Sequence, residues 1–231
     1  MQEPAESDTT LDRLAAALAD LGLILRGGFH PGPEEGLGGR SLLLVGNAGP
    51  EMWRAFSTAP EFRDGQADPL DRWTARALTG LAAGFGAEAL FPFGGPPYRP
   101  FQRWAIRAEG LKASPLGILI HPRFGLWHAY RAALVFPEKL DLPALKAAPC
   151  PCDDCAEKPC LTACPVTAFG PGGYDVEACV RHVAGPAGGD CREQACRARR
   201  ACPIGSEYHY VPAQASFHMA AFLASKTGGT T

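Results

Sequence analysis

The sequence predicts an α+β fold in which a layered core is followed by a cysteine-rich module. Short apolar strands alternate with amphipathic helices over residues 10–136, and the last two strands are expected to be antiparallel. Residues 137–149 are rich in Pro, Ala and Lys and form a natural linker. All nine cysteines then lie between residues 150 and 205. We therefore divide the chain into residues 1–149 and 150–231.

Helices are predicted from apolar residues spaced three or four apart and from capping residues. Asp8 or Thr9 can cap the first helix, and Gly22 can end it. Pro50 suits the first position of a short helix, and residues 70–85 place their apolar side chains on one face. The predicted helices are 10–21, a short one from Pro50, 70–85, 101–108 and 212–225. The two ends, residues 1–8 and 226–231, are expected to be loose.

Strands are predicted where short apolar runs end at Gly, Pro or Asn. Residues 41–45 are typical of a buried strand, and residues 90–93 form a shorter one. Two further strands, 117–120 and 129–136, are expected to be joined by a compact turn at 121–127. The predicted loops, rich in Gly, Pro or polar residues, are 27–39, 60–68 and 94–100.

Composition limits the class of protein. A chain of 231 residues with 46% hydrophobic and 20% charged residues is typical of a soluble globular protein of one domain or one and a half. No apolar run approaches the ~20 residues of a membrane span. The net charge of −2 gives no basic footprint for nucleic acid. Residues 1–25 lack a secretory pattern, and metal-binding thiolates need a reducing compartment. We expect a cytoplasmic protein that binds neither nucleic acid nor membrane.

The spacing of the cysteines predicts two 4Fe–4S clusters. Residues 152–165 read C-x2-C-x4-C-x3-C-P, close to the C-x2-C-x2-C-x3-C-P run of bacterial ferredoxins, whose fourth cysteine ligates the other cluster. By that pattern the first cluster takes Cys152, Cys155, Cys160 and Cys202. The second takes Cys164, Cys179, Cys191 and Cys196. Cys150 is left over and is expected to be a bystander thiol.

Disulfides and zinc are the alternatives for the cysteines. Disulfides need an oxidising compartment, for which residues 1–25 carry no signal. Zinc sites also use C-x2-C spacing. However, the second half of the module lacks a C-x2-C pair, and both halves end on Cys-Pro, as the iron–sulfur run does. Iron–sulfur ligation is the preferred interpretation, and zinc stays open.

The turn at 121–127 and its flanks resemble two protein families. Residues 121–131, HPRFGLWHAYR, with the strand before them, closely resemble the signature of the cobalamin-processing protein CblC. The same segment also resembles epoxyqueuosine reductase, a cobalamin-dependent iron–sulfur enzyme. Residues 42–53 and 68–83 are more weakly similar to CblC. The resemblance to the reductase includes residues 107–111 and continues through 152–165, Tyr174-Asp175 with Cys179, and 191–203. Together the resemblances cover roughly residues 40–205.

The resemblance implies a nitroreductase-like (modified flavin-reductase) core, joined here to a bacterial-ferredoxin-like iron–sulfur module. It also implies a corrinoid beside the turn, and the parent fold allows flavin there. The positions expected to contact cobalamin are Ser114, Pro115, Leu116, Gly117, His121, His128, Ala129 and Tyr130. His121 is expected to be a structural hydrogen-bonding residue more often than a cobalt ligand. Arg123 and Arg131 are candidates for corrin amides or the nucleotide phosphate, or else for surface ion pairs.

Two departures from epoxyqueuosine reductase argue against tRNA as substrate. The catalytic aspartate of that family precedes the helix matching 101–108, whereas residues 94–98 hold no carboxylate here. A general acid typically contributes roughly 10²–10⁴-fold to a rate. The helical-repeat tail that binds tRNA in that family also has no counterpart up to Thr231. No catalytic residue is assigned.

The predicted activity is reduction of a bound cobalamin, or removal of its upper axial ligand, with electrons passing through both clusters to cobalt. A flavodoxin or ferredoxin is the expected donor, and Arg197, Arg199 and Arg200 are expected either to dock it or to offset cluster charge. Three alternatives stay open: a cobalamin-dependent reductase of an organic substrate, an electron-transfer protein without corrinoid, and a zinc-stabilised corrinoid carrier. No oligomeric state is predicted.

Overall fold

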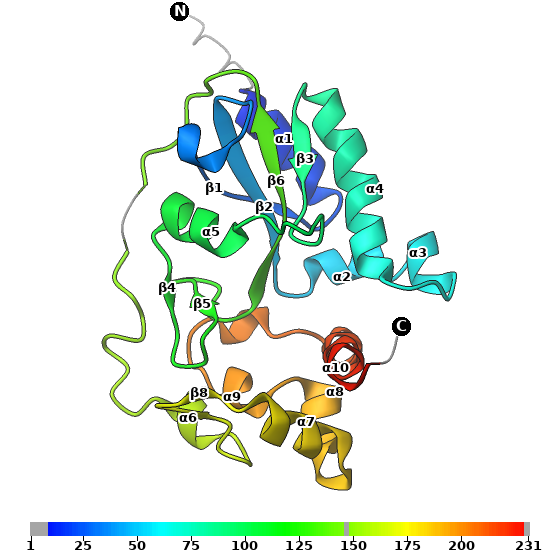
Figure 1. Ribbon diagram of the computed structural model, residues 1–231, viewed down its shortest axis with the longest axis vertical. Coiled ribbons are helices and arrows are strands. Elements are labelled where there is room, and N and C mark those ends of the chain that lie inside the picture. Colours follow the sequence, from blue (N-terminus) through cyan, green and yellow to red (C-terminus); the bar gives the residue numbers. More distant parts are fainter. Residues whose placement is uncertain (1–8, 146–147, 229–231) are drawn as a thin grey trace, which may run out of the picture.

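A four-stranded antiparallel sheet forms the centre of the core (Figure 1). The computed structural model describes residues 9–145 and 148–228. The prediction that the chain is loose at residues 1–8, and at 229–231 within the segment 226–231, lies outside the described residues. The strand order is β1 (Ile24–Phe29), β2 (Ser41–Ala48), β6 (His128–Phe136) and β3 (Glu88–Leu90). Alternate residues of β2 enter different cores: Leu42 and Leu44 on one face, Leu43 and Val45 on the other.

Helices cover both faces of this sheet. The face of Leu43 packs against α1 (Thr10–Ala19), α2 (Glu51–Phe56) and α4 (Pro69–Gly84), and the other face packs against α5 (Phe101–Glu109). α1 begins at Thr9, whose hydroxyl accepts from the Asp12 amide while the Asp12 carboxylate accepts from the Thr9 amide. This capping box satisfies two otherwise free N–H groups, as the sequence led us to expect of Thr9.

The cysteine-rich module lies beneath the core in Figure 1. It is built from short elements, and its last helix packs back onto the core, where Phe217 lies 5.5 Å from the Trp53 ring and 5.3 Å from the Phe56 ring. The elements are α6 (Pro159–Thr162), β7 (Phe169–Gly170), β8 (Gly173–Tyr174), α7 (Val176–Ala184), α8 (Gly189–Gln194), α9 (Arg197–Arg200) and α10 (Pro212–Thr227). The described residues also include three 3₁₀ helices: Pro33–Glu35, Pro186–Gly188 and Ser206–Tyr208.

Several expectations about the elements were wrong. Residues 60–68 were expected to be a loop but contain α3 (Pro60–Arg63), and the strand expected at 90–93 lies at 88–90. The strands expected at 117–120 and 129–136 do not pair. Instead β5 (Leu119–Ile120) pairs with β4 (Lys112–Ala113), and β6 pairs with β2 and β3. Local apolar runs locate strands but do not identify their partners.

The sequence analysis did not predict β1, because it assigned Gly27 and Gly28 to a loop. Both glycines lie inside the strand, where neighbouring backbone comes very close. A Cβ on Gly27 would lie 2.4 Å from the Ala108 carbonyl oxygen at the end of α5. Glycine in a strand often marks such a close approach. The described helices are all too short or too polar to cross a bilayer.

Candidate functional site

Eight of the cysteines form two sets of four in space. Cys152, Cys155, Cys160 and Cys202 line one small cavity. In the other set, Cys179 lies within electrostatic range of Cys164 and Cys191, and Cys196 lies within electrostatic range of Cys179 and Cys191. These are the two sets that the spacing predicts. All nine cysteines are free thiols.

Each set has two buried and two half-buried cysteines, and backbone amides donate to several of the sulfurs. Burial raises the pKa of Cys160, Cys196 and Cys202. The amides of Leu161 and Ile204 donate to Cys160 and Cys202 respectively, and both contacts oppose that rise. Amide hydrogen bonds to sulfur favour the thiolate, the form that binds metal.

The donor type and number in each set suit a 4Fe–4S cluster, which takes four cysteine thiolates. Within the described ranges, no three His, Cys, Asp or Glu side chains come close enough to hold a single metal ion. Cys150 is only 5% exposed and lies beside Cys152, outside the group that lines the cavity.

The HPRFGLW turn touches the cysteine-rich module directly. Gly125 has a φ of +56°, and a Cβ there would lie 1.8 Å from the Ile204 carbonyl oxygen. Only glycine tolerates both this backbone conformation and this approach. Trp127, two residues after Gly125, is 1% exposed because Arg199, His209 and Tyr210 of the module cover it. Residues of the motif therefore hold the two parts of the chain together.

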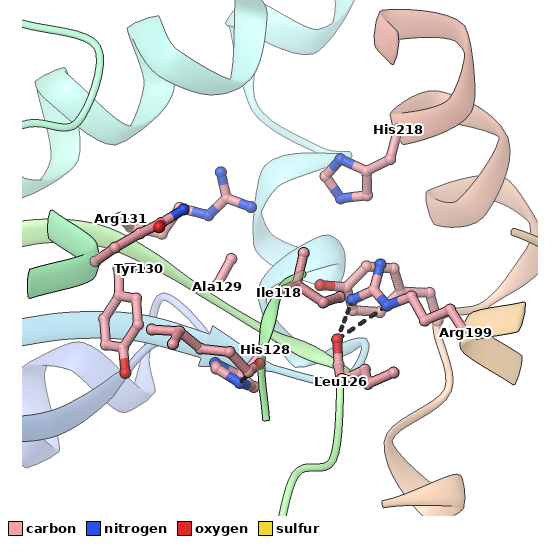
Figure 2. Close-up of a pocket in the computed structure, with 11 residues that line it drawn as sticks. Ile118, Leu126, His128, Ala129, Tyr130, Arg131, Arg199 and His218 are labelled. Carbon is pink, nitrogen blue, oxygen red and sulfur yellow. Dashed lines mark hydrogen bonds between the residues drawn. The ribbon is translucent and has the colours of Figure 1, made fainter. Parts of the chain in front are cut away.

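A second cavity, of about 360 Å³, lies beside this contact (Figure 2). Leu126 lines both this pocket and the cysteine cavity, so one residue lies between them. Arg199 donates from Nε and Nη2 to the Leu126 carbonyl oxygen, at 2.9 and 2.6 Å. The pocket is lined by Gln102, Ile118, Leu119, Leu126, His128, Ala129, Tyr130, Arg131, Arg199, Tyr210 and His218.

Only part of the predicted corrinoid set lines this pocket. His128, Ala129 and Tyr130 do. Ser114 and Pro115 instead line the cysteine cavity, and Leu116 packs in the same cluster as Cys160 and Cys202. Gly117 has open space where a side chain would be. His121 lines a further cavity, of about 640 Å³, with Arg26 and Glu109.

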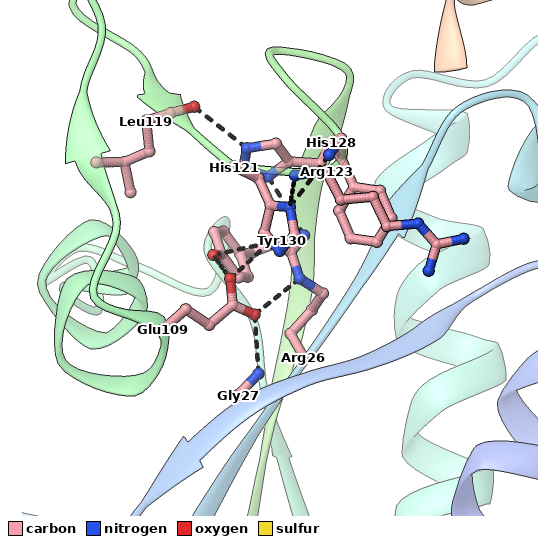
Figure 3. A network of polar contacts seen from close by, with 9 residues as sticks. Arg26, Gly27, Glu109, Leu119, His121, Arg123, His128 and Tyr130 are labelled. Atoms are coloured by element: carbon pink, nitrogen blue, oxygen red, sulfur yellow. Dashed lines mark hydrogen bonds and ion pairs between the residues drawn. The ribbon is translucent and has the colours of Figure 1, made fainter. Parts of the chain in front are cut away.

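A buried ion pair, not anticipated from the sequence, lines that further cavity and contacts His128 and Tyr130, which line the 360 Å³ pocket (Figure 3). Arg26 Nη2 lies 2.6 Å from Glu109 Oε2, and the two side chains are 2% and 10% exposed. Tyr130 donates to Glu109 Oε2 at 2.7 Å, and Arg26 Nη1 lies 3.3 Å from His128 Nδ1. Burial alone would raise the pKa of Glu109, but Arg26 holds it below its usual value. The segment 107–111, which resembles epoxyqueuosine reductase, was the one sign of Glu109 in the sequence.

The histidines near the pockets are held neutral. His121 Nδ1 accepts from the amides of Arg123 and Phe124 at 3.0 and 3.1 Å, which is a structural role within the turn. Burial, together with the charge of Arg26, lowers the pKa of His121 to about 4. Burial also lowers the pKa values of His128 and His218 to about 3. His218 Nε2 is buried and has no hydrogen-bond partner among the residues that the structure describes.

We expect these histidines to make the protein less stable as the pH falls from about 6.5 towards 4. An unfolded histidine takes up its proton near pH 6.5, whereas the folded ones do so only near 3–4, so acid favours the unfolded chain. Urea midpoints at pH 7 and pH 5 measure this. His218→Leu should reduce the difference between the two midpoints. An equal difference in the variant and the natural chain would contradict the assignment.

The three arginines between Cys196 and Cys202 make contacts with other residues of the chain. Arg199 faces the pocket, and Arg197 and Arg200 both pair with Asp190. Arg123, at the turn, donates to the Tyr208 hydroxyl at 2.6 Å, and Arg131 donates to Asn47 at 3.0 Å.

Comparison with known proteins shows the same architecture in two of them. No family model matches the sequence, and no curated protein does. Epoxyqueuosine reductase from Streptococcus thermophilus aligns with a TM-score of 0.52 and 14% identity over 86% of this chain and 66% of that one. The C. elegans B12-trafficking protein CblC aligns with a TM-score of 0.51 and 13% identity over 93% and 95%. The chain thus spans just under two thirds of the reductase, and its α+β fold is the one it shares with epoxyqueuosine reductase and CblC.

Proposed function

We propose that the protein is a cytoplasmic iron–sulfur oxidoreductase that binds cobalamin and reduces it or removes its upper axial ligand. Residues 1–149 form a nitroreductase-like core that holds the corrinoid, and residues 150–231 form a ferredoxin-like module with two 4Fe–4S clusters. The observation that carries the proposal is Leu126, which lines both the cavity of four cysteines and the 360 Å³ pocket. The fold shared with a B12-trafficking protein and with a reductase supports it.

The pocket, of about 360 Å³, can hold part of a corrinoid between apolar and cationic side chains. Ile118, Leu119 and Leu126 give it an apolar wall that excludes water from a bound ligand. A cobalt that loses an axial donor is easier to reduce, so a site that keeps water away from the metal favours the reaction. Arg131 and Arg199 lie among the pocket residues and can bind amide oxygens or a phosphate.

The cysteines supply the redox part of the site. Clusters at the two sets would deliver single electrons at potentials set by burial and by hydrogen bonds to sulfur. Arg199 links the cysteine-rich module to the pocket. It lies in α9, which begins directly after Cys196, and it donates to the Leu126 carbonyl. A flavodoxin or ferredoxin is the proposed electron donor. No pocket residue needs to act as an acid or base in this reaction.

The second candidate is a cobalamin-dependent reductase of an organic substrate. A neighbouring cavity of about 500 Å³ favours it, since Arg131 and His218 line both that cavity and the 360 Å³ pocket. A second ligand bound there would lie next to the corrinoid pocket. The fold shared with epoxyqueuosine reductase is compatible with this candidate as well.

An anaerobic assay with cyanocobalamin, a reduced flavodoxin and no organic substrate tests the proposal. We expect release of cyanide or reduction of the cobalt in the natural protein. Ala129→Trp, which fills the pocket, should lose this activity but keep the iron content and the cluster absorbance. Cobalamin that stays unchanged in the natural protein while an added organic compound is reduced would instead support the second candidate.

A further inference from the structure

The cavity of about 500 Å³ lies where α3, the start of α4 and α10 meet, and no cysteine lines it. Phe62, Leu70 and Phe217 give it an apolar wall, in which the rings of Phe62 and Phe217 lie 6.1 Å apart. Leu70 is buried, and the Phe62 ring packs 5.3 Å from that of Trp53 in the core. The wall is therefore built from well-packed side chains, and the volume is that of a small-molecule site.

Arg131 brings a partly bonded guanidinium group to this cavity. Its Nε donates to Asn47 Oδ1 at 3.0 Å, and Asn47 is fully buried on β2, next to β6. The two terminal amino groups of Arg131 have no hydrogen-bond or ion-pair partner in the described part of the chain. In Figure 2 the guanidinium and the ring of His218 extend towards one another, and both residues line the cavity. Asn47 thus fixes one edge of the guanidinium and leaves the other edge free to bind a carboxylate.

Three carboxylates also line the cavity among the described residues, and they differ in their partners. Glu61 is paired with Arg76, whose Nη2 lies 3.1 Å from Glu61 Oε2. Asp68 is exposed, so solvent screens its charge. Asp71 is half-buried, and its carboxylate makes no hydrogen bond or ion pair with a described residue. Burial raises the pKa of Asp71, and the charge of Arg131 opposes that rise. Asp71 and Arg131 therefore line one cavity as opposite charges that are not paired with each other.

We propose that this cavity binds a small zwitterion, an apolar α-amino acid, with its carboxylate on Arg131 and its ammonium group on Asp71. A partly buried charge without a partner is unfavourable, and each end of such a ligand supplies one missing partner. The apolar side chain of the amino acid lies against Phe62 and Phe217. Because Arg131 also lines the 360 Å³ pocket, the amino acid would lie beside a corrinoid bound there. The inference goes beyond the proposed function and assumes neither the clusters nor cobalamin.

Calorimetric titration of the anaerobically purified natural protein with three probes tests the inference. The probes are L-phenylalanine, hydrocinnamate, which lacks the ammonium group, and phenethylamine, which lacks the carboxylate. L-phenylalanine should bind at least about tenfold more tightly than either of the others, because each of them leaves one charged side chain without a hydrogen-bond partner. No binding of L-phenylalanine, or binding no tighter than that of hydrocinnamate or phenethylamine, would overturn the inference.

Two variants should remove one half of this preference each. In Arg131→Met, L-phenylalanine should bind no better than phenethylamine, and in Asp71→Asn no better than hydrocinnamate. Asp71→Asn keeps the inference testable if Arg131→Met fails to fold. The matched controls Arg103→Met and Glu88→Gln change exposed residues outside this cavity, so they should keep the natural order of the three probes. Folded Asp71→Asn protein that still prefers L-phenylalanine to hydrocinnamate would overturn the inference. A hydroxocobalamin titration of the same preparation tests the proposed function separately.

Discussion

Cys202→Ser is expected to remove one of the two clusters and to abolish cobalamin reduction. Cys202 comes from the far end of the module and completes the set around the cavity that adjoins Leu126. Without its thiolate, the first set keeps three ligands, and the iron content should fall from about eight to about four per chain, because each cluster holds four irons. Iron analysis and the visible spectrum of anaerobic protein measure the loss.

Cys150→Ser is the matched control for Cys202→Ser. Both thiols are buried in the same apolar cluster, but Cys150 lies beside Cys152 and does not line the cavity. The control should therefore retain about eight irons and most of the activity. The assignment of ligands would be wrong if Cys150→Ser lost as much iron as Cys202→Ser, or if Cys202→Ser lost none.

Glu109→Gln is expected to lower the free energy of unfolding by about 3–5 kcal/mol, because it leaves a buried arginine charge without its partner. Arg26 is almost fully buried, and Glu109 also accepts from Tyr130 and from the Gly27 amide at 2.8 Å. Tyr130 lines the pocket, so cobalamin affinity should fall as well. Urea unfolding at pH 7 gives the stability, and a spectral titration gives the affinity.

The exposed pair of Lys112 and Asp153 provides the control for this prediction. Both side chains are 62% exposed, and the atoms are 3.2 Å apart. Ion pairs of this kind contribute little to stability, so Asp153→Asn should leave the urea midpoint almost unchanged. Equal changes in the urea midpoint for Glu109→Gln and Asp153→Asn would show that the buried pair does not stabilise the fold more than the exposed pair does.

The features predicted well from the sequence are those encoded over short stretches. α1, α4 and α10 follow from local periodicity and capping. The grouping of the cysteines in space agrees with the spacing, since the ferredoxin pattern specifies which cysteine crosses to the other set, and their role as cluster ligands stays a prediction. The pairing of β5 with β4, and the strand through Gly27, depended on tertiary contacts that no local pattern carries.

The ion pair and the hydrogen bonds of the site likewise join residues that are far apart in the sequence, so no local pattern predicts them. Arg26 and Glu109 are 83 residues apart, and each resembles an ordinary surface charge in the sequence. Arg199 was expected either to dock an electron donor or to offset cluster charge, and its hydrogen bonds to the Leu126 carbonyl, 73 residues away in sequence, were not expected.

The most direct test of the account is an anaerobic titration of the purified protein with hydroxocobalamin, followed by its visible spectrum and paired with an iron count. We predict about eight irons per chain, as two 4Fe–4S clusters require, a broad absorbance that bleaches on reduction with dithionite, and a shift of the bound cobalamin to its base-off spectrum. About four irons or none, or a cobalamin spectrum that the protein leaves unchanged, would contradict it.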